Sequence, residues 1–410
     1  SRQEDIYPLV YYYIAYGYQN LHRKENTKQT NHYMTAYVTL GENAVADGCF
    51  PHRTEDYIVL KSLADDYYLD MVYYYLGCLL YDRRAYGEAI VDYEEAALRY
   101  PDFPTAHRNL ALAYYNVKKQ PQRAYEEMEK AFALDETDAR VYLELDQLKK
   151  RLNVPVKERW SDMEKHFDLV ESRDDLYLEY VTLLNTLGES EKALNLIKAR
   201  KFHQWEGGEG KVAAQYLTAL YQLAKAAAAE GEYVEAKTIL LQAVDEYPQN
   251  LGEGKLESAQ ENNLYYLLGL AQEKLGETEE AFVNLTKACH GESEPVGMMY
   301  YNDQPPEMIF YQGLAYRKLG NEEQAVRRFR KLVEYGREHI EENVKIDYFA
   351  VSLPDLLIFE ENLDERNRKH CLFMMSLGLK GLGRSDEAEK CAEELLAMDN
   401  AHQGIRVHDL

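Results

Sequence analysis

Three stretches of the sequence that are rich in glycine or proline carry acidic side chains. These stretches are Phe202–Lys211, Asn250–Lys255 and Met298–Pro306. Two neighbouring carboxylates can act as general acid and general base, and the candidates here are Glu206, Glu209, Glu253 and Asp303. A chain with 71 acidic residues supplies such groups by chance, and no HExxH, GxSxG, CxxC or Walker pattern accompanies them. We therefore expect no catalytic residues, no metal site and no cofactor.

Two of the stretches share a Gly-Glu-Gly-Lys core, which spans residues 208–211 and 252–255. Backbone N–H groups of glycines before a helix can bind an anion or ligand oxygens. In that case the ammonium groups of Lys211 and Lys255 would also contact the bound anion or ligand oxygens. In the alternative interpretation the glycines only turn the chain, and each lysine pairs with a neighbouring glutamate. Exposed aromatic residues on the same loops indicate a ligand or partner contact, and they are Trp205, Tyr300 and Tyr301.

The elements that must position these loops follow an internal repeat. Gly77 is followed by Ala89 twelve residues later, and then by Tyr93, Ala96 and Pro101. This spacing resembles the tetratricopeptide repeat, a pair of antiparallel helices of about 34 residues. Small residues are expected where the two helices cross, and proline ends the second helix because it lacks an N–H group. The small residue recurs at Ala124, Ala193, Ala236, Ala281 and Ala325. We therefore predict an all-α solenoid of helical hairpins, wound as a right-handed superhelix.

The repeat also predicts the organisation of the chain. Residues 1–69 would form atypical helical repeats, with a helical pair over 11–44 and a further helix over 52–64. Tetratricopeptide repeats would fill residues 70–345, interrupted by long loops at 201–211, 249–256 and 291–306. An irregular segment, a last repeat and a capping helix at Ser385–Met398 would fill 346–410. Glycines that end first helices with positive φ are expected at Gly87, Gly188, Gly231, Gly276, Gly320 and Gly383.

In this repeat the first helix of each hairpin lines the concave face. Each first helix also carries a small residue, such as Gly77 in the first copy. The residue three positions before this small residue is then expected to point into the groove. These positions are aromatic in five of seven copies, and hold Tyr74, Arg108, Leu178, Tyr221, Tyr266, Phe310 and Phe373. Aromatic rings offer flat apolar faces to sugars or peptide side chains. The alternative is an ordinary packing stripe, because aromatic residues at helical spacing usually pack against other helices.

The composition excludes several classes of partner. The chain of 410 residues has a formal net charge of −24, so it lacks the basic surface that nucleic acids and anionic membranes require. No secretory signal and no apolar stretch of about 20 residues is present. Five cysteines without CxxC spacing indicate buried thiols in a reducing compartment. We therefore predict a cytoplasmic protein that binds neither nucleic acid nor membrane.

Several further stretches resemble one bacterial family. They are Cys49–Arg53, Pro101–Leu110, Trp205–Lys211, Ala259–Asn262, Tyr301–Pro306 and Phe349–Pro354. The stretches are similar to those of large tetratricopeptide-repeat proteins whose helical region follows a β-rich, sugar-mutarotase-like domain. The resemblance implies a cytoplasmic bacterial protein with a carbohydrate link. Because the sequence starts without Met and enters helix-like sequence almost at once, we expect the chain to be a fragment of a longer protein. The expected partners are a protein or the upstream domain, with a saccharide and a second copy of the chain as further candidates. In the alternative function, the loops complete the active site of a carbohydrate-active enzyme.

Overall fold

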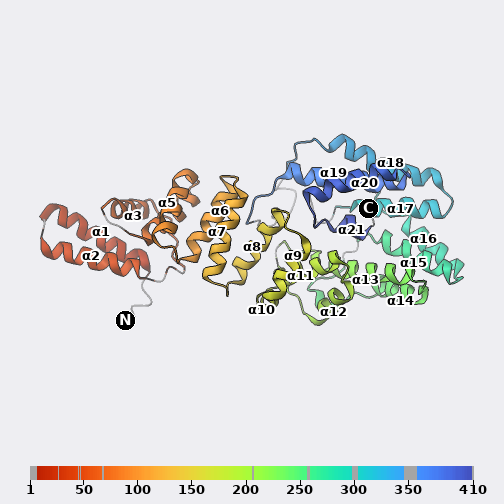
Figure 1. Cartoon of the computed structure of the whole chain (residues 1–410), viewed down its shortest axis with the longest axis horizontal. Helices are drawn as coiled ribbons and strands as arrows, with labels where there is room; N and C mark the ends of the chain where they lie inside the picture. Colours follow the sequence, from red (N-terminus) through yellow and green to blue (C-terminus); the bar gives the residue numbers. More distant parts are fainter. Residues whose placement is uncertain are drawn as a thin grey trace. The chain divides into compact units, whose positions relative to one another are not determined.

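The fold is built from helices alone within the part of the chain that the computed structural model describes (Figure 1). The chain divides into two compact units, Ser1–Leu148 and Lys149–Leu410. The described residues are 7–25, 27–44, 46, 48–66, 69–205, 207–255, 259–297, 303–345 and 358–408.

The first unit consists mainly of antiparallel helix pairs. Helices α1 and α2, α4 and α5, and α6 and α7 pack against each other as pairs, and α3 packs on α1 and α4. The helices are α1 (Pro8–Glu25), α2 (Lys28–Glu42), α3 (Thr54–Asp66), α4 (Met71–Asp82), α5 (Tyr86–Arg99), α6 (Pro104–Asn116), α7 (Pro121–Leu134) and α8 (Ala139–Arg151), the last of which runs across the unit boundary. Helices are therefore present over both stretches for which an atypical N-terminal pair and a further helix are predicted.

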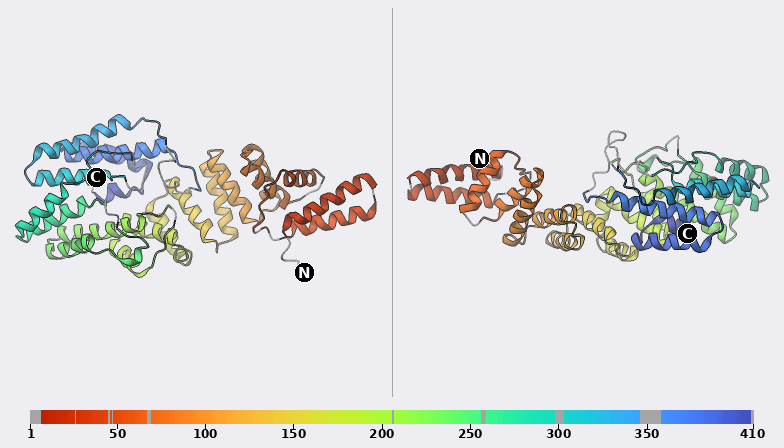
Figure 2. Two further views of the ribbon diagram at one scale, coloured as in Figure 1. Left: turned by 180° about the vertical axis from the view of Figure 1, so that it is seen from behind. Right: turned by 90° about the horizontal axis from the view of Figure 1, so that it is seen from above.

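The second unit continues the hairpin architecture. Figure 2 shows its hairpins following one another around a curve, with α21 on the inner side. The helices are α9 (Val156–Lys165), α10 (Phe167–Ser172), α11 (Asp174–Leu187), α12 (Ser190–Ala199), α13 (Lys211–Ala229), α14 (Tyr233–Asp245), the 3₁₀ turn η2 (Gln249–Leu251), α15 (Asn262–Lys274), α16 (Thr278–Ala288), α17 (Pro306–Lys318), α18 (Glu322–His339), α19 (Leu363–Gly381), α20 (Ser385–Met398) and α21 (Gln403–Val407).

The small residues of the repeat lie where the two helices of a hairpin cross. A Cβ atom added at Gly77 would lie 2.6 Å from the Tyr93 ring, and one at Gly313 would lie 2.4 Å from the Phe329 ring. Ala89 and Ala325 on the second helices are fully buried. A larger side chain at these positions would push the helices apart, because protein interiors are close-packed. The expected close crossing is confirmed.

Most of the predicted turn glycines adopt the left-handed conformation that ends a helix. Positive φ angles of 74° to 86° occur at Gly188, Gly231, Gly276, Gly320 and Gly383. The prediction for Gly87 is wrong, because this residue lies in the first turn of α5. In that hairpin Arg84 takes the left-handed conformation instead, with φ 62°.

Candidate functional site

Two of the predicted loops lie side by side in the second unit. The first follows α12 and the second follows α14. The backbone N–H of Phe202 donates to the carbonyl of Asn250 at 2.9 Å. The Asn250 side chain in turn donates to the carbonyl oxygens of Ile197 and Arg200, both at 2.8 Å. Phe202 is buried and anchors the first loop in the core. We call residues 200–210 and 249–255 together the paired loops.

An ion pair with α11 fixes the start of the first loop. The Arg200 guanidinium contacts the Asp174 carboxylate at 2.6 Å, and the His203 backbone N–H donates to the same carboxylate at 2.8 Å. Burial alone would raise the pKa of Asp174, but the hydrogen bonds from His203 and Arg200 outweigh it and lower the pKa. The Arg200 side chain also lies over the ring of Tyr177 at 4.4 Å. The loop therefore leaves α12 in a defined direction.

The second loop caps the helix that follows the first. One Glu253 carboxylate oxygen accepts from the backbone N–H of Gly210 at 2.7 Å, and the other accepts from Ala213 at 3.3 Å. A negative charge at a helix N-terminus is stabilising, because the N–H groups there have no partner within the helix. The carboxylate occupies the helix end that was a candidate for anion binding. Lys255 contacts Glu261 at 2.6 Å. This lysine therefore pairs with a neighbouring glutamate, as the alternative interpretation of the Gly-Glu-Gly-Lys core predicts.

Trp205 covers the turn of the first loop. A Cβ atom at Gly208 would lie 2.3 Å from Cε2 of the indole, so only glycine allows the ring to lie this close to the backbone. The Gly208 N–H also donates to the Trp205 carbonyl at 3.0 Å. Gly207 and Gly210 have positive φ angles of 79° and 73°. The Trp205 side chain remains half-buried, and therefore keeps part of its surface available for contact.

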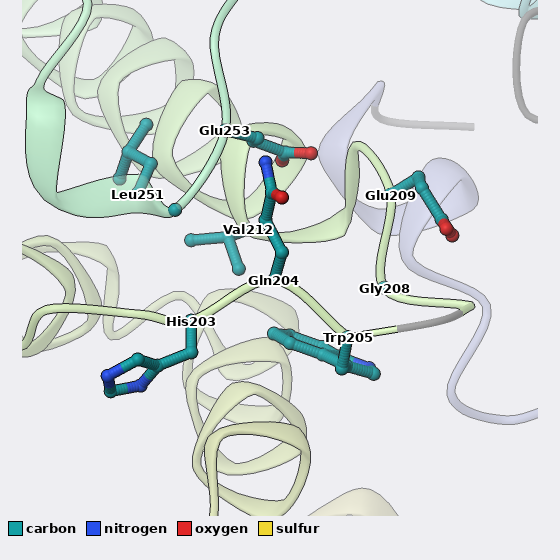
Figure 3. Close-up of a pocket in the computed structure, with 9 residues that line it drawn as sticks. His203, Gln204, Trp205, Gly208, Glu209, Val212, Leu251 and Glu253 are labelled. Carbon is teal, nitrogen blue, oxygen red and sulfur yellow. The ribbon is translucent and has the colours of Figure 1, made fainter.

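A cavity of about 410 Å³ opens between the paired loops (Figure 3). Val212 and Leu251 give it apolar walls, and Gln204 and Glu209 add exposed polar groups. His203 points away from the other lining side chains in Figure 3. A second cavity of about 480 Å³ lies against the same loops, and it shares Gln204, Gly252 and Glu253 with the first. Its further lining residues are Lys201, Phe202, Tyr247, Gln249, Gly254 and Lys255.

The paired loops thus bring together several of the predicted site residues. Trp205, Glu209 and Glu253 line the first cavity, Lys255 lines the second, and Lys211 begins α13 as an exposed residue. The predicted residues Glu206, Tyr300 and Tyr301 lie outside the described residues.

The third predicted loop is tied to other helices. Gln312 of α17 donates to the carbonyl of Glu292 at 2.7 Å, and His370 of α19 contacts the carbonyl of Val296 at 2.8 Å. Asp303 lies on this loop, half-buried, just before α17. Its role as a contact residue stays a prediction.

The predicted aromatic stripe is largely buried. Tyr221 is 4% exposed, and its hydroxyl lies 2.5 Å from that of Tyr311. Arg108 forms a bidentate pair with Glu144, at 2.6 Å for each bond. Tyr266 is half-buried. The remaining members of the stripe are buried, and they are Tyr74, Leu178, Phe310 and Phe373. Ligand binding by this stripe stays a prediction.

Sequence reasoning missed two parts of the inner side of the second unit. Tyr311 lies one position beyond the residue that the repeat rule selects, yet its ring contacts both Tyr221 and Tyr266. Its hydroxyl also lies 3.0 Å from Nδ1 of His408. The segment 399–408 carries no repeat signal that predicts this contact. The sequence hinted at Tyr311 only in that it is an aromatic residue directly after Phe310.

The described residues contain no group of three or more His, Cys, Asp or Glu side chains that could hold a metal ion. Among the described helices, none is both long and apolar enough to cross a membrane.

Family comparisons agree with the hairpin geometry. Models of the tetratricopeptide repeat match residues 74–139, 218–250, 263–289 and 307–335. The protein contains tetratricopeptide repeats. The matched residues fall on the hairpins α4–α5, α6–α7, α13–α14, α15–α16 and α17–α18.

Two solved structures are similar at low sequence identity. The structure of Naa15/Naa10 bound to HypK-THB is 14% identical, with a TM-score of 0.34, over 82% of this chain and 53% of that chain. The P58(IPK) TPR domain is 17% identical, with a TM-score of 0.20, over 82% of this chain and 75% of that chain. This chain spans about half the length of the first of these.

Proposed function

We propose that this tetratricopeptide-repeat protein is a binding scaffold whose paired loops contact a protein partner. One observation carries the proposal: the cavity of about 410 Å³ is lined by the half-buried Trp205 and the exposed Glu209. The repeats supply a rigid frame, because each hairpin packs on its neighbours. Loops inserted at equivalent places of a solenoid project from one edge, which is often the binding edge.

The loops are held in shape before any partner arrives. Asp174 fixes the start of the first loop, and Glu253 fixes its end to the second loop. A preformed site loses less conformational entropy when it binds a partner. Contacts to a partner at this site therefore translate more fully into affinity.

The chemistry of the cavity favours a basic side chain of the partner, flanked by aliphatic residues. A guanidinium or ammonium group can lie on the face of an indole, and a nearby carboxylate strengthens that attraction. Trp205 supplies the ring and Glu209 the exposed carboxylate, while Val212 and Leu251 offer apolar contacts. The net charge of −24 attracts basic partners at long range.

A saccharide is the second candidate for the same site. Its support is the combination of an indole face with carboxylate and amide groups, since sugars present apolar faces and hydroxyl groups together. Gln204 and Glu209 would accept or donate the hydrogen bonds. Under this proposal the loops would complete a site of a carbohydrate-active enzyme, with an upstream domain supplying the catalytic groups. The cytoplasmic location and self-association also remain proposals.

The test uses the fact that the chain contains only two tryptophans. In the variant Trp160→Phe, Trp205 becomes the only fluorescent indole. The probes are peptides with one Arg between aliphatic residues, the same peptides with Gln in place of Arg, and a panel of oligosaccharides. The proposal predicts a saturable change of Trp205 emission with the Arg peptides. Binding should be about 2- to 30-fold weaker with Gln, as expected for the loss of one cation–π contact.

Two further variants serve as controls for this titration. Glu209→Gln in the Trp160→Phe background should weaken binding of the Arg peptide. Glu230→Gln should leave it unchanged, since Glu230 lies at the other end of α13, roughly 28 Å away for a helix of this length. Binding of an oligosaccharide but of no peptide would support the second candidate. No response to any probe would contradict both.

A further inference from the structure

A groove runs between the second helices of two successive hairpins in the second unit. Helix α15 packs against both α14 and α16 (Figure 1), so it forms the floor between these two helices. A cavity of about 420 Å³ lies there. Its lining residues are Leu241, Val244 and Asp245 on α14, Tyr265, Leu268 and Gln272 on α15, and Glu279, Glu280, Val283, Asn284 and Lys287 on α16. We call it the α14–α16 groove, and its walls are second helices, so it is separate from the face that first helices line.

An ion pair joins the two walls at one end of the groove. The Lys237 ammonium on α14 contacts the carboxylate of Glu277, the residue that caps α16, at 2.6 Å. Both side chains are about two-thirds buried, so solvent and salt screen this pair only in part. Lys237 lies one helical turn before Leu241. The pair therefore fixes the distance between α14 and α16 next to the cavity before any partner binds.

Aliphatic side chains along the groove remain in contact with solvent. Val283 is 51% exposed, and Leu241 is 36% exposed. Val234 is 65% exposed and shares a face of α14 with Leu241, because residues seven positions apart lie on the same side of a helix. Leu268 adds a buried apolar contact at the floor. An apolar strip that polar residues surround is typical of a site of protein interaction.

The floor of the groove carries a buried amide whose nitrogen has no acceptor. Gln272 is 5% exposed, and its side-chain oxygen accepts from Nδ2 of Asn284 at 2.8 Å. Its amide nitrogen forms no hydrogen bond with any residue that the structure describes. Buried polar groups almost always have a hydrogen-bond partner, because an unpaired one is costly. Since Gln272 lines the cavity, this donor points to a bound molecule that brings an acceptor, such as a hydroxyl or amide oxygen.

Three carboxylates around the groove lack a cation. Asp245, Glu279 and Glu280 are exposed. None of their carboxylates forms an ion pair or a hydrogen bond within the part of the chain that the structure describes. The ammonium group of the lining belongs to Lys287, and it lies over the ring of Tyr265 at 5.0 Å. The lining therefore has an excess of two negative charges, which attracts a basic side chain.

We propose that the α14–α16 groove binds an amphipathic helix of a partner protein. The partner helix places aliphatic side chains between Leu241 and Val283, and an arginine or lysine one turn away beside Glu279 and Glu280. Helices that bind in grooves present their anchors at positions i, i+3, i+4 and i+7, so both kinds of side chain can face the groove. A second copy of this chain is disfavoured as the occupant by the net charge of −24. This proposal goes beyond the paired loops, since it uses other residues and can hold if their function fails.

The first experiment measures binding of designed peptides to the full chain by fluorescence anisotropy. The probe is a labelled peptide of about 20 residues, long enough to form a helix in water. One face of it carries Leu at i and i+7 and Arg at i+3 and i+4, and a second peptide has Gln in place of both arginines. The Arg peptide should bind saturably, and the Gln peptide about 3- to 10-fold more weakly. No saturable binding of the Arg peptide would overturn the proposal.

Variants of exposed residues show where the peptide binds. The double variant Glu279→Gln/Glu280→Gln should weaken binding of the Arg peptide about 3- to 10-fold, and should leave that of the Gln peptide unchanged. The matched control Glu230→Gln/Glu235→Gln removes two exposed carboxylates that do not line the cavity, and should bind both peptides as wild type does. Leu241→Ser should weaken both peptides. Equal effects of the two double variants would mean attraction by the overall charge alone, and would overturn the proposal.

Sedimentation of the chain without peptide tests the other occupant. Val283→Ser makes the groove more polar at an exposed position, so the variant should fold. The proposal predicts that wild type and Val283→Ser sediment alike at every concentration. An oligomer of the wild type that dissociates in Val283→Ser would show that a second copy covers the groove, and would overturn the proposal.

Discussion

Removal of the Glu253 carboxylate should destabilise the second unit measurably. This residue connects two loops that are 43 positions apart in the sequence, through bonds to Gly210 and Ala213 at the N-terminus of α13. A charge at a helix N-terminus contributes about 0.3–1 kcal/mol, and up to about 2 kcal/mol when partly buried. Loss of a helix cap costs about 1 kcal/mol. We therefore expect Glu253→Ala to lower the free energy of unfolding by about 1–2 kcal/mol.

The variant Glu253→Gln separates charge from hydrogen bonding. Its amide oxygen can still accept one hydrogen bond, so the expected loss is smaller, about 0.5–1 kcal/mol. The assay is urea unfolding followed by circular dichroism at neutral pH. In the Trp160→Phe background, emission of Trp205 should also shift to longer wavelength with Glu253→Ala, because the loop that carries the indole loses its attachment.

The matched control is Glu209→Gln, which removes an exposed carboxylate from the same cavity. A surface change of this kind should alter stability by less than about 0.5 kcal/mol. The reasoning would be refuted if Glu253→Ala and Glu209→Gln unfolded at the same urea concentration with unchanged Trp205 emission. That result would mean that the paired loops keep their shape without the cap.

Three further predictions test other parts of the structure. Arg108→Ala removes the bidentate partner of the Glu144 side chain, which is 2% exposed, and leaves Arg140 at 3.2 Å as its remaining ion-pair partner. We expect the free energy of unfolding in urea to fall by about 2 kcal/mol, and a loss of less than about 0.5 kcal/mol would contradict this. Asn153 takes the left-handed conformation with φ 58°, and its side chain accepts from the Asn400 N–H and donates to the Ala397 carbonyl. Asn153→Ala should cost about 2–4 kcal/mol through these two lost hydrogen bonds and left-handed strain, whereas Asn153→Gly should cost less; equal losses would argue against strain. Burial raises the pKa of Glu307 to about 7. The free energy of unfolding of the wild type should therefore fall by about 3 kcal/mol as pH rises from 4.5 through 7. Glu307→Gln should remove this dependence, and parallel pH curves of the two proteins would contradict it.

The sign of the pH effect follows from proton binding. The folded state holds the proton of Glu307 more tightly than the unfolded chain does, whose carboxyl titrates near 4.5. The stabilisation is therefore complete below pH 4.5 and is lost as pH rises through 7. His370 acts in the opposite direction, because burial lowers its pKa to about 4. Its contribution is present above about pH 6.5 and is lost as pH falls toward 4.

The hairpins could be predicted from the sequence because their packing is local. Small residues such as Gly77 and Ala89 recur at fixed spacing where helices cross, and the structure has them there. Helix α20 spans Ser385–Met398, as its sequence predicts. Gly87 shows the limit of this reasoning. A glycine near a turn indicates a bend, but the residue that takes positive φ depends on the length of that turn.

Contacts between distant residues could not be predicted in the same way. The Gly-Glu-Gly-Lys copies indicated the right loops, yet nothing in the sequence indicated that Glu253 caps the helix of the other copy. The stripe around Tyr221 follows the repeat, but its burial depends on Tyr311 and on residues 399–408, which contact α13 from almost 190 positions away. Asn153 in its left-handed conformation likewise accepts a hydrogen bond from Asn400, a residue far away in the sequence. Such pairings depend on how the repeats curve, which repeat spacing does not encode.

Site-specific crosslinking tests most directly whether the paired loops contact a protein. A photo-reactive amino acid would replace Glu209 in the full chain, expressed in its source cells, with the same amino acid at Glu230 as the control. Both residues are exposed, and they flank opposite ends of α13. The account predicts a discrete protein adduct at position 209 that is absent at position 230 and is lost with Trp205→Leu. Equal crosslinking at both positions, or none at 209, would contradict it.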